Sequence, residues 1–138
     1  TLEVDAKHAE VARVNIRRAG LADIVELRLG SALETLPQLA GEGRGPFDLI
    51  FIDADKQSIP EYFHWAFKLS RRGSLIMVDN VVRKGAVIDG ASDDPSVQGV
   101  RRFNELAAAE PRVSATAIQT VGSKGYDGFA MVLVTDDP

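Results

Sequence analysis

Two runs of mostly apolar residues are each followed directly by residues whose side-chain oxygens are able to bind a metal ion. Asp53 follows Phe47–Ile52, and Asp79 with Asn80 follows Ser74–Val78, 26 residues after Asp53. That spacing is one strand–helix–strand unit, so we expect neighbouring strands whose carboxyl ends share the edge where open α/β sheets bind ligands. Two carboxylates and an amide oxygen, without His or Cys, suit Mg²⁺, Mn²⁺ or Ca²⁺. The sequence predicts a divalent-cation site; the alternative is that Asp53 begins a turn and Asp79 and Asn80 cap the next element.

Four more charged residues lie at or shortly after the ends of predicted strands. Lys56 lies three residues after Asp53, and an amine beside a cation and desolvated by a substrate is able to act as a general base. The alternative is an exposed lysine paired with Asp55. Glu3 occupies the position where a doubly wound fold holds a nucleoside ribose, although it also fits an outward strand residue. Arg83 and Lys84 follow Asn80 closely enough to contact an anionic substrate, although the default interpretation of such a basic pair is a solvated face.

Strands and helices alternate along the chain, which predicts an α/β fold with a parallel sheet. A helix is expected between an N-cap at Asp5 and a stop at Gly20. The remaining predicted helices cover 31–39, 60–69 and 97–109; the predicted strands cover 1–4, 24–29, 47–52, 74–78, 113–118 and 129–134; and loops are expected at 41–46, 85–96 and 122–128. The run 47–52 is continuous enough for a central strand buried on both faces. Only about ten residues separate the last two strands, so the final strand should be antiparallel.

Composition limits the classes of protein that remain. The 138 residues are enough for one domain, and a net charge of −4 argues against nucleic acid or an anionic membrane as the main partner. The chain has no cysteine, and the sequence shows no apolar run long enough for a transmembrane helix and no signal peptide, so we expect a cytoplasmic protein. No strand or glycine-rich turn precedes Leu2. We therefore expect residues 1–138 to be the C-terminal portion of a single larger domain, without its first strand and glycine-rich loop.

Four segments carry a resemblance to a known family. The run FDLIFIDADK, the strand end LIMVDNV, the opening TLEVDAKHAEVARVNIRRAG and the ending VGSKGYDGFAMVLV resemble the cation-dependent, S-adenosylmethionine-dependent O-methyltransferases, in the bacterial branch of the caffeoyl-CoA and catechol group. The resemblance covers essentially the whole chain. It implies a Rossmann-like class I methyltransferase sheet, mostly parallel with an antiparallel last strand.

The resemblance also implies roles for individual residues. The metal ligands would be Asp53, Asp79 and Asn80, with Lys56 as the catalytic base; the S-adenosylmethionine-binding residues would be Glu3, Gly30, Ser31, Ala32, Asp53 and Ala54. The implied acceptor is a catechol-like phenol or a hydroxycinnamoyl-CoA ester, and a homodimer is expected. Acceptor specificity would come from Gly85–Ser96, from the turn near Lys124 and Tyr126, and from residues that precede this segment.

Two rival readings use the same residues differently. In an NAD(P)-dependent oxidoreductase, Glu3 would hold the cofactor ribose, but the cluster at Asp53, Asp79 and Asn80 would have no use. A catalytically silent fragment would only bind a partner or dimerise through an open sheet.

Overall fold

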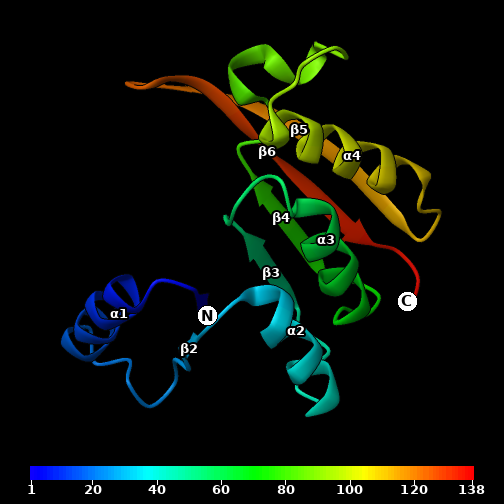
Figure 1. The fold of residues 1–138 in the computed structure, drawn as a ribbon. Coiled ribbons are helices and arrows are strands. Elements are labelled where there is room, and N and C mark those ends of the chain that lie inside the picture. The colour runs from blue at the N-terminus through cyan, green and yellow to red at the C-terminus, as the bar shows by residue number, and fades with distance from the viewer. The chain divides into compact units, whose positions relative to one another are not determined.

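Residues 1–138 are described by a computed structural model, in which they divide into two units, Thr1–Arg44 and Gly45–Pro138 (Figure 1). The α/β alternation predicted from the sequence is present in both. No helix of the structure has the length and apolar character needed to cross a bilayer.

The first unit is a two-stranded parallel sheet with two helices. Strand β1 (Leu2–Glu3) pairs with β2 (Arg28–Leu29), and the helices are α1 (Ala6–Arg18) and α2 (Ala32–Gly41). The predicted N-cap of α1 is confirmed, because the Asp5 carboxylate accepts the backbone N–H of Lys7 at 2.7 Å and of His8 at 3.0 Å.

The strand predicted over 24–29 is mostly wrong. Only Arg28 and Leu29 pair with β1, and the Ile24 side chain is 78% exposed. Strand β1 offers just two residues as pairing partners, so the alternating pattern before Arg28 has no ladder to join.

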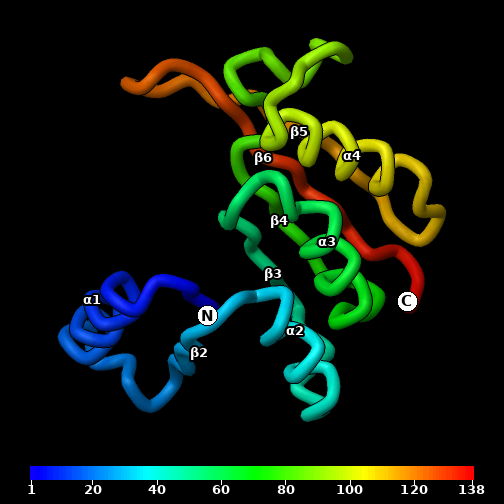
Figure 2. The backbone as a smooth tube through the Cα atoms, viewed as in Figure 1, coloured from blue at the N-terminus to red at the C-terminus, as the bar shows by residue number.

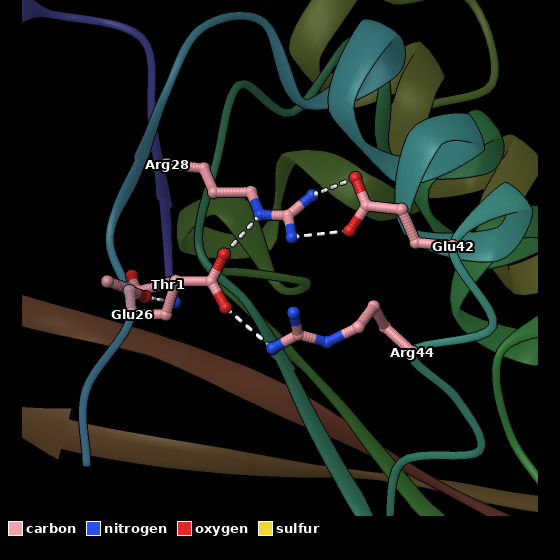
Figure 3. A network of polar contacts seen from close by, with 5 residues as sticks. All are labelled: Thr1, Glu26, Arg28, Glu42 and Arg44. Atoms are coloured by element: carbon pink, nitrogen blue, oxygen red, sulfur yellow. Dashed lines mark hydrogen bonds and ion pairs between the residues drawn. The ribbon is translucent and has the colours of Figure 1, made fainter. Parts of the chain in front are cut away.

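A network of ion pairs joins β2 to the end of α2 in this unit (Figure 3). The Arg28 guanidinium donates to Glu26 at 2.6 Å and to both carboxylate oxygens of Glu42 at 2.9 and 2.6 Å. Arg44 donates to the second oxygen of Glu26 at 2.6 Å, and the N-terminal amine of Thr1 donates to the Glu26 carbonyl oxygen at 2.7 Å. The bidentate pair between Arg28 and Glu42 fixes the orientation of both side chains.

This network predicts acid sensitivity of the first unit. The hydrogen bonds from Arg28 hold the pKa of Glu26 and of Glu42 below the ordinary value of 4.5. A carboxyl with a lowered folded-state pKa contributes stability above its unfolded pKa, and that contribution is lost as the pH falls through the folded value. We expect the melting temperature to drop between about pH 5 and about pH 3, and to drop less in Glu42→Gln. Melting curves across that range, followed by circular dichroism, provide the check; equal slopes for the two proteins would contradict it.

The second unit is a four-stranded sheet in the order β3-β4-β6-β5. Its strands are β3 (Leu49–Ile52), β4 (Leu75–Asp79), β5 (Val113–Gly122) and β6 (Gly125–Val134). Strands β3 and β4 are parallel, whereas β6 is antiparallel to both β4 and β5, so the prediction of an antiparallel last strand is confirmed.

Helices α3 (Ile59–Lys68) and α4 (Pro95–Ala109) pack together on one face of this sheet (Figure 1). Phe63 of α3 meets Phe103 of α4 edge-to-face, with ring centroids 5.2 Å apart. The apolar residues of β4 and β6 that face these helices are almost fully buried: Ile76, Val78, Val132 and Val134.

Three details of the second unit differ from the predictions. Strand β3 is not buried on both faces, since it pairs only with β4 and leaves Leu49 and Phe51 58% and 59% exposed. The final hairpin is longer than predicted, because its strands pair up to Gly122 and Gly125 and extend as one long arm in Figure 2. The expected loop at 85–96 is partly helical, with a short 3-10 helix, η1 (Arg83–Ile88).

Candidate functional site

The two strand ends singled out by the sequence are neighbours in the second unit. Strands β3 and β4 run parallel with Ile52 opposite Val78, so Asp53 and Asp79 follow at the same end of adjacent strands. Adjacent strands lie about 4.8 Å apart. Asn80 comes next in a left-handed conformation (φ 60°), which asparagine tolerates better than most residues. The sheet therefore brings two carboxylates and one amide to a common edge.

Each of these three side chains keeps an oxygen that accepts no hydrogen bond. Asp53 Oδ1 accepts from Lys56, and Asp79 Oδ1 accepts the backbone N–H of Asn80 at 2.7 Å, which leaves the Oδ2 atom of each carboxylate free. The Asn80 side-chain oxygen has no hydrogen-bond donor either. No group of three or more His, Cys, Asp or Glu side chains is placed to hold a metal. Two carboxylates and an amide are a smaller but chemically suitable set for a hard divalent cation.

Lys56 contacts the carboxylate of Asp53, the residue predicted to bind the cation, and not that of Asp55. Its Nζ lies 2.8 Å from Asp53 Oδ1, and its side chain is only 10% exposed. The alternative pairing with Asp55 is wrong in this structure. The amine is thus held at the strand edge and largely shielded from water.

Asp55 instead orders the loop that carries Lys56. Its carboxylate accepts the Ser58 backbone N–H at 3.1 Å and the Tyr62 hydroxyl at 2.5 Å. Burial works to raise the pKa of Asp55, but these hydrogen bonds outweigh it and hold the pKa below its ordinary value. Burial, together with the hydrogen bond to Asp55, raises the pKa of Tyr62 to about 12, so this hydroxyl stays protonated and continues to donate.

Helix α4 packs directly behind the same loop. Gly99 is buried, and a Cβ built on it would collide with the Lys56 carbonyl oxygen and lie 2.8 Å from Gln57 Cα. Only glycine permits this approach of the helix backbone to the loop. The position of Lys56 is thus set from α4 as well as from β3.

The residues assigned to the cofactor by resemblance lie at the ends of β1 and β2 in the first unit. Glu3 is half-buried and pairs opposite Leu29, next to Gly30. Its carboxylate accepts the Asp5 backbone N–H at 2.8 Å, while the Gly30 N–H donates to the Glu3 carbonyl oxygen at 2.9 Å. Ser31 is the N-cap of α2 and its hydroxyl makes no capping hydrogen bond. Glu3, Gly30, Ser31 and Ala32 therefore share one sheet edge.

Sequence reasoning missed Gly99, Tyr62 and Asp127, which support the loops around the strand ends. A lone glycine inside a helical pattern was the only signal available for Gly99. Asp127 accepts three backbone N–H groups, among them those of Val82 and Arg83 some 45 residues away in sequence. No local pattern announces such contacts.

Comparison with known proteins gives a consistent result. The family described as O-methyltransferase matches residues 1–133. A catechol O-methyltransferase of Niastella koreensis is 57% identical over 134 residues, which cover 97% of this chain and 61% of the relative.

Solved structures give the same picture. The O-methyltransferase from Bacillus cereus in complex with SAH has a TM-score of 0.95 and 66% identity, over 97% of this chain and 61% of that one. The O-methyltransferase TomG from Streptomyces achromogenes in complex with SAM also has a TM-score of 0.95, with 53% identity, over 98% of this chain and 60% of that one. The chain thus spans about three-fifths of the length of the proteins it matches. These matches give no support to the NAD(P)-dependent oxidoreductase reading, and they agree with the Rossmann-like methyltransferase fold.

Proposed function

The chain belongs to the O-methyltransferase family, and from this premise we propose that the full-length protein transfers a methyl group from S-adenosylmethionine to a phenolic hydroxyl in a divalent-cation-dependent reaction. The acceptor we propose is a catechol-like phenol or a hydroxycinnamoyl-CoA ester. The observation that carries the proposal is the register of β3 and β4, which brings Asp53, Asp79 and Asn80 to the same edge of the sheet. Lys56 contacts Asp53 at this edge.

Asp53, Asp79 and Asn80 would hold the cation through the oxygens that accept no hydrogen bond in this structure. When bound, Mg²⁺ (or Mn²⁺ or Ca²⁺) would supply Lewis-acid and template chemistry to two vicinal oxygens of the acceptor. The chain's own contribution is positional: the sheet edge orients the acceptor, and Asp53 holds the Lys56 amine beside it.

The Lys56 amine would accept the proton of the attacking hydroxyl. The phenolate oxygen then forms a bond to the methyl carbon as the carbon–sulfur bond of the sulfonium breaks, and the electron pair stays on a neutral thioether. Because that leaving group needs no proton, no general acid is required.

For the cofactor, we assign Glu3 to the ribose hydroxyls and Gly30, Ser31 and Ala32 to the adenine. Their support is the shared edge of β1 and β2, where Glu3 is next to Gly30. Asp53 and Ala54, also assigned to the cofactor by resemblance, lie in the second unit and their role stays a prediction.

Lys56→Met tests the proposal. We expect kcat to fall roughly 10²- to 10⁴-fold, the usual loss on removing a general base, with the affinity for S-adenosylhomocysteine unchanged. The measurements are methyl transfer to catechol with Mg²⁺ or with EDTA, and calorimetric titration with S-adenosylhomocysteine. Lys68→Met, on the exposed side of α3, is the control and should match the wild type.

Wild-type activity that EDTA leaves unchanged would contradict the proposed role of a cation. A Lys56→Met enzyme with the kcat of the wild type would contradict the proposed role of Lys56 as the general base. A full-length protein that methylates no catechol and binds no S-adenosylhomocysteine would favour the reading of a silent binding protein instead. The homodimer also stays a proposal, which sedimentation of the full-length protein checks.

A further inference from the structure

A cavity of about 410 Å³ opens beside the end of β4, between the turn that follows this strand and the tip of the β5–β6 hairpin. One of its walls is Asn80, a residue to which we assign the cation, so the cavity borders the reacting centre proposed above. Lys84, Lys124, Tyr126 and Asp127 also line it.

The two walls of this cavity are hydrogen-bonded to each other. The Tyr126 hydroxyl donates to the Lys84 carbonyl oxygen at 2.6 Å. Asp127 Oδ1 accepts the backbone N–H of Val82 at 3.1 Å and of Arg83 at 3.0 Å. The long hairpin is thus fastened to the turn after β4, and the cavity has a defined shape.

The turn itself is strained, which is a mark of functional sites. Asn80, Arg83 and Lys84 all have φ between 53° and 60°, a region that costs a non-glycine residue energy. Asp127 and Tyr126 hold this conformation from the opposite wall. These hydrogen bonds keep the Lys84 backbone turned against the hairpin tip.

Two of the side chains that line the cavity are cationic and one is anionic. Lys84 and Lys124 both line it, and neither takes part in an ion pair of the structure. Asp127 supplies the one carboxylate among the lining residues, and its Oδ1 atom accepts three backbone N–H groups that hold it against the turn after β4. Arg83, in the same turn, has a buried Nε atom with no hydrogen-bond partner. Unpaired cations beside a reacting centre attract an anionic ligand group.

We propose that this cavity binds an anionic group of the methyl acceptor, a carboxylate or phosphate carried beyond the phenolic ring, with Lys84 and Lys124 as its cationic contacts. The inference rests on the proposed function and adds to it the residues of this chain that contact a charged group of the acceptor. A neutral phenol of the same shape binds more weakly, and a cationic phenolic amine binds more weakly still.

The test compares 3,4-dihydroxycinnamate with its methyl ester, which keeps the ring and the reacting hydroxyls but lacks the charge. In the full-length protein we expect the acid to have the lower KM, with similar kcat for both. Lys84→Gln and Lys124→Gln should each raise the KM of the acid roughly two- to fivefold, as for a partly exposed ion pair, and leave that of the ester unchanged. Added salt should raise the KM of the acid only. Lys68→Gln, whose lysine does not line the cavity, is the control.

Caffeoyl-CoA separates the two sources of negative charge. A KM increase in the lysine variants for the acid identifies a carboxylate subsite, and an increase confined to the thioester identifies a phosphate subsite; both support the proposal. A KM that is unaltered in the double variant for all three acceptors, the acid, the ester and the thioester, would overturn it.

Equilibrium binding keeps this test separate from the test of the proposed function. Calorimetry measures the affinities for the acid and the ester even if no methyl transfer occurs. A preference for the acid that disappears in the double lysine variant supports the subsite whatever the turnover. Absence of turnover with every acceptor overturns the proposed function alone.

Discussion

Asp53→Ala in the full-length protein is expected to abolish cation-dependent methyl transfer, with kcat/KM falling roughly 10³-fold or more. The substitution removes one of the two carboxylates at the shared edge of β3 and β4 and leaves Asp79 and Asn80 too few to hold the cation. It also removes the acceptor that holds Lys56 Nζ at 2.8 Å. Rates with S-adenosylmethionine and catechol, together with Mn²⁺ binding followed by electron paramagnetic resonance, provide the measurement.

Two further variants separate these effects. Asp53→Asn keeps an oxygen ligand but removes the charge, so Mn²⁺ affinity should fall less than in Asp53→Ala. Asp48→Asn, which changes an exposed carboxylate that pairs with Arg71 just before β3, should leave metal binding and rate unaltered. Full activity of Asp53→Ala in the presence of a chelator would rule out this carboxylate as a metal ligand.

Gly99→Ala is expected to impair both stability and catalysis, although residue 99 touches no substrate. The added methyl group would collide with the Lys56 carbonyl oxygen and crowd Gln57, so either α4 or the loop has to shift. Overpacking of this kind costs about 1–3 kcal/mol of unfolding free energy. A displaced Lys56 also loses its alignment, so we expect kcat to fall roughly tenfold or more with little change in the affinity for S-adenosylhomocysteine.

Gly41→Ala is the matched control, since a Cβ at this last residue of α2 meets nothing within 4 Å. It should be neutral or slightly stabilising, because alanine is the better helix former. Chemical denaturation gives the stability, and rates taken where both variants are fully folded give kcat. A Gly99→Ala protein with the melting temperature and kcat of the wild type would show that the loop accommodates the methyl group freely.

The local sequence pattern was sufficient to predict the strands that end in candidate functional residues. Continuous apolar runs predicted β3 and β4, and the side chains that follow such runs come to one edge whenever the strands are parallel neighbours. Asp5 and Gly20 marked the ends of α1 because capping depends on a few adjacent residues. The antiparallel final strand followed from the shortness of its connection.

The local sequence pattern failed to predict the structure where a strand's pairing with its neighbours decides its extent or its burial. The alternating residues from Ile24 look like a strand, but β1 offers them no ladder, and only Arg28 and Leu29 pair. The exposure of Leu49 and Phe51 depends on what covers β3, which its own residues do not encode. The hairpin was predicted too short because Gly122–Gly128 is rich in turn residues, yet cross-strand hydrogen bonds extend through most of it.

The amino-acid sequence by itself determined the α/β alternation, the family resemblance and the residues that stand at each strand end, since periodicity, capping and strand-end chemistry are properties of short segments. Only the tertiary structure decided that Lys56 pairs with Asp53, that Gly99 supports its loop, and that Lys84 and Lys124 line one cavity. These relations depend on packing between segments far apart in the chain, where side-chain rotamers and close backbone contacts select one partner among several that local pattern allows.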